Sequence, residues 1–355
     1  MSDTHYTIRL AQDCDQQHWD NYILSHPEAS PYHLFAWKKA VEEAYGHKGY
    51  YLLVEHDTKI EGVLPLIHFH LPFVLNSFTS LPFCDIGNAL CNTSEVCRLL
   101  LDESRALCHE KKIKKMNLRG EMSVPSDHLK EFVPENHNKV RMTMNLPGSS
   151  ESLMNGFKSK LRSQIRKAQQ NGLTFSWAND ANLHGYYCVF SQNMRDLGSP
   201  VHSRKWFQCI MKHYGQNAKM AIVHYEHEIV GGCILLAAGK TIAIPWASTL
   251  RKYNKLAPNM LLYWNVLQYA ADAGFTTFDF GRSSEGEGTY KFKKQWGATP
   301  TPLDWYSFMP SSDQASPSDS QADTSKKQKI AQIWSRIPIP LANLLGPRIR
   351  RYISL

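Results

Sequence analysis

The sequence of 355 residues has no apolar run near the ~20 residues that a membrane-spanning helix needs. The start of the chain, Met1–Leu10, also lacks the apolar core of a secretory signal peptide. We therefore expect a cytoplasmic protein. Hydrophobic residues make up 43% and charged residues 20%, which excludes wholesale disorder. A chain of this length predicts about two globular units.

Clustered metal ligands are missing as well. The eight cysteines are scattered without a CxxC pair, and HExxH is absent, so the sequence does not indicate a zinc site. Most cysteines are expected to be small buried hydrophobic residues. His68 and His70 share one face of an expected strand, but such a pair is more often half exposed than metal-bound. We expect no metal.

Acidic residues are absent from residues 326–355, where Lys and Arg occur seven times. These charges are nearly the whole net charge of +8, so a nucleic-acid surface across the protein is not indicated. The preceding residues, 310–325, include no large apolar side chain and predict a flexible linker. The folded body is therefore expected over about residues 5–309, with a basic amphipathic tail at 326–355.

Within the body, one order of elements occurs twice at nearly the same spacing. Each copy indicates a hairpin of two strands, then a helix, then a short strand. The first copy uses residues 50–69, 99–110 and 115–119, and the second uses 220–238, 261–273 and 277–281. The second strand of each hairpin opens with an apolar residue and a nearby glycine, Gly62 or Gly231. This order favours the tandem duplication of an α/β unit with a mixed sheet.

Residues 151–171 predict a helix that begins near Ser149 or Ser150 and ends at Gly172. We place the boundary between the two units just before it, so that they span residues 5–146 and 147–309. One stripe of the helix is apolar: Leu153, Phe157, Leu161, Ile165 and Ala168. Outside this stripe the helix carries five cations with no acidic residue between them: Lys158, Lys160, Arg162, Arg166 and Lys167. Such a group is typical either of a solvated helix face or of a phosphate-binding site.

A second candidate site is the segment FDFGRSSEGEGTYKFKKQWG, residues 278–297. A strand that carries Asp279 ends at Gly281, and a glycine-containing loop leads into an aromatic and basic run. Glycines after a strand let the backbone approach a ligand closely. An extended run would place Tyr290 and Phe292 on one face and Lys291 and Lys293 on the other. The alternative is an edge strand whose lysines prevent aggregation.

This segment resembles the signature of FemAB-like acyltransferases, in which DFGR and a glycine-rich gap precede Y-x-FK-x-x-W/F-G. The helix KLRSQIRKA, residues 160–168, with Gly172 resembles the family's K-x-R-x-x-I-R-K-A helix. Similar positions in the N-terminal half are Trp37, the strand 62–66 and the segment Ser80–Phe83. The chain most resembles the FemAB-related proteins that accompany exosortase and PEP-CTERM systems, over residues 5–309 and in the tail segment IWSRIP.

The resemblance implies two GNAT-like halves in tandem that transfer an acyl or aminoacyl group to an amine. In aminoacyl-transferring relatives the lysine of the FK pair stabilises developing negative charge, and the matching residue is Lys293. One such donor beside an oxyanion contributes ~3 kcal/mol. Asp279 and Tyr290 are the nearest candidates for a general acid or base. The expected substrate- or donor-binding residues are Lys160, Arg162, Arg166, Lys167, Arg282, Phe292 and Trp296.

No permanently bound cofactor is expected, and the acyl donor stays open between acyl-CoA and aminoacyl-tRNA. Between Arg282 and the loop glycines there is one residue too many for the Q/R-x-x-G-x-G/A loop of acetyl-CoA enzymes. The basic helix would suit tRNA phosphates. The expected acceptor is an amine on a sugar nucleotide, lipid-linked glycan or peptidoglycan-type precursor, in exopolysaccharide or cell-envelope synthesis. The alternative is a non-catalytic protein of this fold that binds an anionic carrier or partner.

The tail, residues 326–355, admits two interpretations. Its cations, its tryptophan and its aliphatic residues suit contact with an anionic inner-membrane surface. A tail that packs back onto the body as a helix is the alternative. In either case Pro338 and Pro340 prevent one continuous helix, so we expect a short helix on each side of them.

Overall fold

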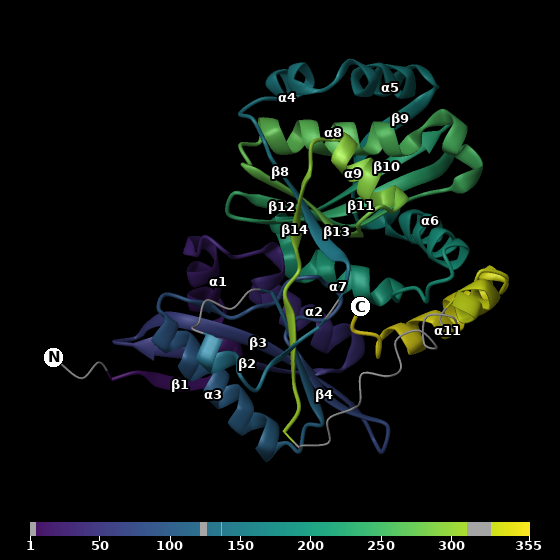
Figure 1. The fold of residues 1–355 in the computed structure, drawn as a ribbon. Helices are drawn as coiled ribbons and strands as arrows, with labels where there is room; N and C mark the ends of the chain where they lie inside the picture. Colours follow the sequence, from purple (N-terminus) through teal and green to yellow (C-terminus); the bar gives the residue numbers. More distant parts are fainter. Residues whose placement is uncertain (1–4, 121–125, 136, 311–327) are drawn as a thin grey trace. The chain divides into compact units, whose positions relative to one another are not determined.

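The computed structural model describes residues 5–120, 126–135, 137–310 and 328–355. They form two compact units, each built on one mixed sheet (Figure 1). The N-terminal unit consists of its described residues up to Lys139, of 302–310 and of Ser354–Leu355, and the C-terminal unit of 140–301 and 328–353. Apart from Pro310, the expected linker lies outside the described residues.

The N-terminal unit has the strand order β1-β2-β3-β4-β6-β15-β7, and β5 pairs with β3. Its strands are β1 (Thr7–Leu10), β2 (Lys48–His56), β3 (Lys59–Leu71), β4 (Leu75–Thr79), β5 (Leu90–Cys91), β6 (Lys115–Arg119), β7 (Val133–Pro134) and β15 (Trp305–Phe308). Its helices are η1 (Asp13–Asp15), α1 (Gln16–Ser25), η2 (Pro31–His33), α2 (Phe35–Tyr45), α3 (Ser94–Glu110) and η3 (Ser126–Leu129).

The C-terminal unit has the strand order β14-β8-β13-β12-β11-β10-β9. Its strands are β8 (Lys139–Asn145), β9 (Leu173–Ala178), β10 (Ala218–Tyr225), β11 (Glu228–Ala238), β12 (Thr241–Thr249), β13 (Thr277–Ser284) and β14 (Thr299–Pro302). Its helices are α4 (Ser150–Gly156), α5 (Ser159–Gln170), η4 (Asp180–Asn182), α6 (Leu183–Asp196), α7 (Arg204–Tyr214), η5 (Gly215–Asn217), η6 (Arg251–Leu256), α8 (Pro258–Asp272), α9 (Gly288–Gln295) and α11 (Ile339–Arg350).

The two units repeat one topology. In each, three antiparallel strands lead into a crossover helix and then into a strand parallel to the third: β2-β3-β4-α3-β6 and β10-β11-β12-α8-β13. The expected duplication, its mixed sheets and its four hairpin strands are confirmed. At Gly62 of β3 a Cβ atom would lie 2.4 Å from Val96 Cγ1, so the glycine lets α3 pack closely on the sheet.

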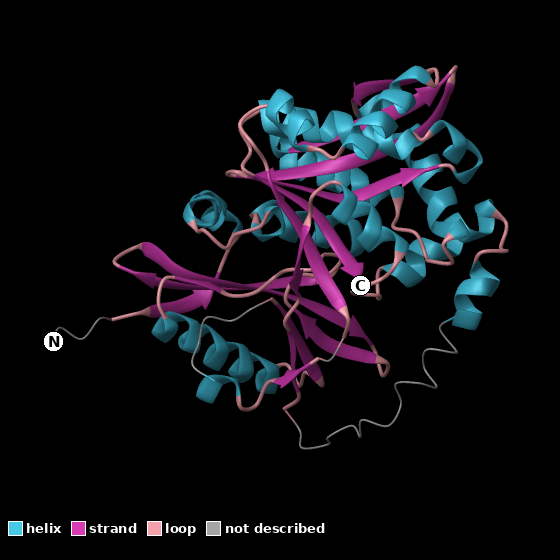
Figure 2. Cartoon of the chain, turned by 45° about the horizontal axis from the view of Figure 1, so that its top comes forward, coloured by secondary structure: helices cyan, strands magenta, loops and turns pink. Residues whose placement is uncertain are grey.

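Helices cover both faces of the C-terminal sheet. Helices α4, α5 and α8 lie on one face and α6 and α7 on the other (Figures 1 and 2). The expected apolar stripe of residues 153–168 is buried in the core between α4, α5, α8 and the sheet, which confirms it. The described helices thus sandwich the strand, β13, that leads to the candidate site.

The single helix expected over residues 151–171 is instead two helices, α4 and α5. Phe157 and Lys158 adopt extended backbone conformations between them. The break lets the Phe157 ring pack edge-on against Trp264 and Trp296, with centroids 6.2 and 5.6 Å away. The expected ends are confirmed, because Ser149 accepts a hydrogen bond from the Ser152 N–H and Gly172 has a φ of +74°.

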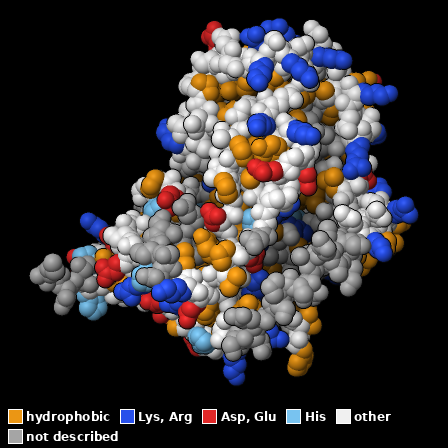
Figure 3. Space-filling view, in the orientation of Figure 1, with side chains coloured by type: hydrophobic (Ala, Val, Ile, Leu, Met, Phe, Trp, Pro, Cys, Tyr) orange, Lys and Arg blue, Asp and Glu red, His pale blue; other side chains and the backbone are white. Residues whose placement is uncertain are grey.

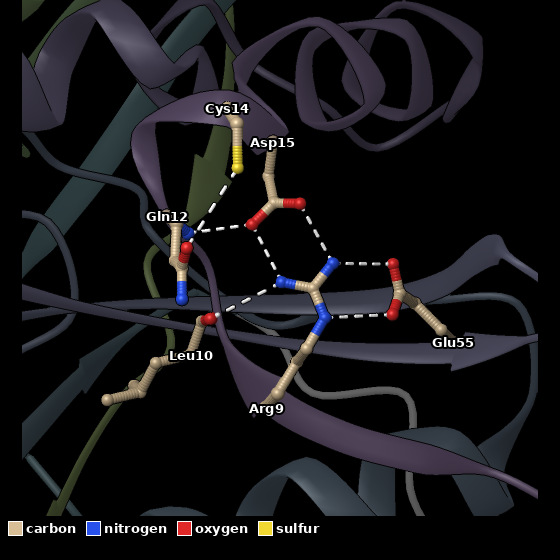
Figure 4. A network of polar contacts seen from close by, with 6 residues as sticks. All are labelled: Arg9, Leu10, Gln12, Cys14, Asp15 and Glu55. Carbon is tan, nitrogen blue, oxygen red and sulfur yellow. Dashed lines mark hydrogen bonds and ion pairs between the residues drawn. The ribbon is translucent and has the colours of Figure 1, made fainter.

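The start of the N-terminal unit is held by the guanidinium of Arg9 (Figure 4). It forms ion pairs with Asp15 at 2.7 Å and with Glu55 at 2.8 Å, which joins β1 to η1 and β2. The hydrogen bond from Arg9 lowers the pKa of the Asp15 carboxyl, which also accepts the Gln12 N–H. Because every charge in this cluster has a partner, we interpret it as structural.

The division between the units differs from the expected one at residues 146 and 147. The division falls after Lys139, because residues from Val140 onward in β8 belong to the C-terminal sheet. Residues 302–309, expected in the C-terminal unit, belong to the N-terminal one. There β15 pairs antiparallel with β6, and Phe308 packs on Phe132 with ring centroids 5.5 Å apart.

The described tail residues pack against the C-terminal unit. As expected from the two prolines, residues 328–334 are helical and α11 begins after Pro338. Trp334 and Ala342 are buried, and Arg195 donates a hydrogen bond to the Ser335 carbonyl. Arg350 Nε donates to His202 Nε2, whose pKa burial lowers well below its usual range, so that the ring is neutral and can accept.

Candidate active site

The candidate site lies within β13, where the Asp279 side chain closes a turn of the backbone at Gly281. The strand expected to end at Gly281 continues to Ser284. The carboxylate is 2% exposed and pairs with Arg141 of the neighbouring strand β8, with Arg141 Nη2 2.9 Å from Oδ2. Its other oxygen accepts the N–H of Gly281 at 2.7 Å. Gly281 has a φ of +71°, a conformation that favours glycine. Asp279, expected as an acid or base, therefore holds the turn with Oδ1 and pairs with Arg141 of β8 through Oδ2.

Lys293 lies on α9 and points its ammonium group at this turn. The residue is 8% exposed, and Nζ donates to the carbonyl oxygens of Gly281 at 3.2 Å and Arg282 at 2.7 Å. Backbone carbonyls compensate the desolvation of a buried cation. The result is a fixed positive charge beside β13, and a fixed cation is a group that can stabilise an oxyanion.

The aromatic and basic run is helical rather than extended, because it forms α9. On a helix Tyr290 and Phe292 no longer share a face, but Lys291 and Lys293, two residues apart, still point in different directions. Lys291 is accordingly exposed while Lys293 is buried. Tyr290 and Phe292 are half-buried against the core, and Lys294 Nζ lies 5.6 Å from the Tyr290 ring centroid.

Trp296, expected as a binding residue, is fully buried in the core. Its ring stacks near Tyr263, and Phe292 contacts the same tyrosine edge-on at 4.9 Å. Within the described residues the Trp296 Nε1 atom has no hydrogen-bond partner. Trp296 therefore anchors α9 beneath the site and does not line a ligand surface.

The basic helix α5 lies beside α9, since the Gln295 amide donates a hydrogen bond to the Gln164 carbonyl oxygen. Gln164 shares its flank of α5 with Lys160 and Lys167, at spacings of four and three residues. Arg162 and Arg166 lie on the opposite flank of the apolar stripe. The structure thus divides the expected cation set into a lysine flank toward α9 and an arginine flank away from it.

These cations are uncommitted. Among the described residues, the side chains of Lys160, Arg162, Arg166 and Lys167 form no ion pair or hydrogen bond, and all but the half-buried Arg162 are exposed. Lys and Arg side chains are visible over the α4–α5 region at the top of Figure 3. A group of unpaired cations on one helix is suited to bind a phosphate-bearing molecule.

We expect the double variant Arg162→Gln and Arg166→Gln to raise the KM for the donor or carrier about tenfold or more, because charged hydrogen bonds of about 1.5–3 kcal/mol each are lost. The thermal midpoint should change little, since neither side chain is buried. Steady-state kinetics and thermal unfolding measure the two quantities.

The matched control is Lys160→Gln with Lys167→Gln, which removes the same charge from the other flank. We expect a smaller rise in KM, because lysine lacks the fork that binds phosphate bidentately. A lower thermal midpoint with an unchanged KM in the arginine variant would instead assign α5 a purely structural role.

Sequence reasoning missed two contributors. Arg141 stands 138 residues before its partner Asp279, and Gln164 stands 131 residues before Gln295. The lone arginine in the alternating strand KVRMTMN was the available signal for the first. Nothing in the local sequence singles out the second.

The His68–His70 pair has its own polar contact, because His68 Nε2 lies 2.6 Å from Asn76 Oδ1.

Comparison with known proteins places the site in a known domain type. Residues 155–294 match the family described as "Acetyltransferase (GNAT) domain". The lipid II:glycine glycyltransferase of Staphylococcus aureus strain USA300 is 20% identical over 383 residues, covering 80% of this chain and 88% of the relative. The enzyme of the same name from Staphylococcus saprophyticus is 31% identical over 81 residues, which is only 20% of its length.

Two solved structures share the fold. The crystal structure of FemX superposes with a TM-score of 0.69 at 15% identity, over 85% of this chain and 97% of that one. A tandem GNAT protein from the clavulanic acid biosynthesis pathway has a TM-score of 0.55 at 10% identity, over 87% and 99% of the two chains. The expected fold of two GNAT-like units in tandem is confirmed.

Proposed function

We propose that this chain, a tandem GNAT-type acyl or aminoacyl transferase, moves its acyl group onto an amine of a lipid-linked or sugar-nucleotide precursor of the cell envelope. The observation that carries the proposal is the buried Lys293 ammonium, fixed by two carbonyls of β13 inside the matched GNAT domain. The name of the glycyltransferase relatives, which refers to lipid II, supports a lipid-linked acceptor.

In the proposed reaction the acceptor amine attacks the carbonyl carbon of the donor ester or thioester. The carbonyl oxygen becomes negatively charged, and the Lys293 cation stabilises it without having to reorient. The oxyanion then collapses, the donor's oxygen or sulfur leaves with a proton, and the amine becomes an amide. Asp279 acts as a positioning residue, because it sets the turn whose carbonyl holds Lys293.

We propose a donor that carries phosphate, either acyl-CoA or aminoacyl-tRNA. The uncommitted cations of α5 beside α9 support this class of donor. The exosortase-associated resemblance of the sequence supports an acceptor in exopolysaccharide or envelope synthesis.

We also propose that the tail contacts the inner-membrane surface. None of the helices in the described residues is long and apolar enough to cross a bilayer. The packed tail nevertheless keeps six large aliphatic side chains exposed: Ile330, Ile333, Leu341, Leu344, Leu345 and Ile349. Basic residues accompany them with no acid, so the face suits anionic headgroups over a lipid boundary.

A donor panel tests the enzymatic proposal. The purified full-length chain is incubated with radiolabelled aminoacyl-tRNAs or acyl-CoAs and with amine-bearing acceptors, namely lipid II and amino-sugar nucleotides. We expect label to enter one acceptor as a base-stable amide with at least one donor class. Lack of transfer with every donor, from a protein that retains its thermal unfolding transition, would contradict the proposal.

A further inference from the structure

The N-terminal unit has a cavity of about 210 Å³ that the proposed reaction does not use. It lies where β6 meets β15 and is lined by Lys115, Asn117, Arg119, Glu135 and Trp305. The last two residues of the chain, Ser354 and Leu355, complete its wall. A segment 235 residues from Arg119 in sequence thus forms part of the wall of a cavity in the N-terminal unit.

Ser354 is held as a bound peptide would be. Its carbonyl oxygen accepts the N–H of Phe83 at 2.7 Å and Nη1 of Arg119 at 3.2 Å. Its hydroxyl oxygen accepts Nη2 of Arg119 at 2.9 Å. One arginine therefore contacts both the main chain and the side chain of the same residue, which is a specific mode of recognition.

The arginine is fixed by contacts other than those to the chain end. Arg119 is 4% exposed, and Nη1 also donates to the carbonyls of Leu81 and Cys84, each at 2.9 Å. Its guanidinium lies over the Trp305 ring, 5.5 Å from the centroid, and the Trp305 N–H donates to the Asp85 carbonyl. The donors that meet Ser354 are thus also held by contacts that do not involve Ser354.

The segment Ser80–Phe83, which the sequence singled out and the reaction leaves unused, forms one side of this site. Phe83 has a φ of +67°, an uncommon conformation for a residue other than glycine. In this conformation the Phe83 N–H donates a hydrogen bond to the Ser354 carbonyl oxygen. Such backbone conformations are concentrated at ligand-binding positions.

The cavity wall also keeps a polar atom for a further contact. Asn117 Oδ1 is buried and, among the described residues, accepts no hydrogen bond. Lys115 and Glu135 form an ion pair of 2.8 Å on the same wall. The free Asn117 Oδ1 shares the cavity wall with Ser354, whose carbonyl and hydroxyl are bound. It could accept a hydrogen bond from a main-chain N–H of an extended peptide.

We propose that the wall of this cavity is a binding site for an extended peptide segment and that the chain's own Ser354–Leu355 lies against it as a reversible intramolecular ligand. The bound segment is recognised through the carbonyl and hydroxyl of its serine. Release of Ser354–Leu355 exposes the site, and a peptide that contains the same residues competes with them for it.

The test uses a chain that ends at Ile353 and a fluorescein-labelled peptide with the sequence of the last five residues, RYISL. Fluorescence anisotropy is expected to show saturable binding to the shortened chain and at least tenfold weaker binding to the full-length chain. Equal binding to both chains, or to neither, would overturn the proposal. Circular dichroism and thermal unfolding establish that the shortened chain is folded.

Changes on the peptide keep the test independent of protein folding. The peptide RYIAL lacks the hydroxyl that meets Arg119 Nη2, and we expect its affinity for the shortened chain to fall about five- to tenfold. A scrambled peptide of the same composition, with its serine moved from the penultimate position, serves as the control for charge and apolar attraction. Affinities that do not differ among the three peptides would show that the binding is nonspecific.

Discussion

Replacement of Lys293 by alanine or methionine is expected to lower kcat for acyl transfer at least 100-fold. Stabilisation of the oxyanion by one fixed donor contributes about 3–4 kcal/mol, and neither replacement supplies a positive charge. Methionine keeps an unbranched apolar side chain in the buried position, so the loss of activity in the methionine variant measures the contribution of the ammonium group. The measurement is single-turnover kinetics with the donor and acceptor identified by the panel.

The matched control is Lys291→Ala, on the same helix α9. Lys291 is exposed and points away from the turn at Gly281, so its removal should change kcat less than threefold. Because Lys293 also donates to the carbonyls of Gly281 and Arg282, the thermal midpoint of each variant is measured beside its activity. A folded Lys293→Met protein with near-normal kcat would refute the assigned role.

Acidic residues on the exposed face of the tail should abolish binding to anionic vesicles. The double variant Ile333→Asp and Leu344→Asp replaces side chains that are 66% and 54% exposed. Each change removes about 1 kcal/mol or more of apolar burial in the lipid and adds a repulsion of about 1 kcal/mol from the headgroups. We expect at least 30-fold weaker co-sedimentation with phosphatidylglycerol-containing vesicles.

The control is Leu24→Asp with Val133→Asp, which places two acids on exposed aliphatic positions of the N-terminal unit. Its vesicle binding should equal that of the unchanged protein. Point substitutions are preferable to removal of the tail, because Trp334 and Ala342 are buried and their loss would expose apolar surface. Equal binding by the tail variant and the control, or no binding by the unchanged protein, would exclude the membrane contact.

Lys293 illustrates how far the sequence could define the candidate site. The FK pair identified the residue, but not its helical setting, because residues 290–293 of α9 alternate aromatic and basic side chains as a strand would. Short runs of this kind do not distinguish the residue period of a helix from that of a strand. Phe292 and Trp296, four residues apart, both contact Tyr263 of α8, and these contacts favour the helix.

Asp279 and Trp296 show the same limit for individual roles. A carboxylate beside a glycine turn suits either catalysis or support, and only the structure shows that both of its oxygens are engaged, by Arg141 of β8 and by the Gly281 N–H. An aromatic residue after a basic run suits either a ligand surface or the core. The ring contacts of Trp296 with Phe157 and Tyr263 place it in the core.

The sequence by itself determined the repeated α/β order, the two hairpins, the crossover helices and the proline break in the tail. These features arise from local periodicity, glycine and proline, which act over a few residues. Only the tertiary structure decided the pairing of β15 with β6, the ion pair of Arg141 with Asp279 and the position of Ser354 against Arg119. Those contacts join residues more than a hundred positions apart, where no local pattern records which partner will be buried beside which.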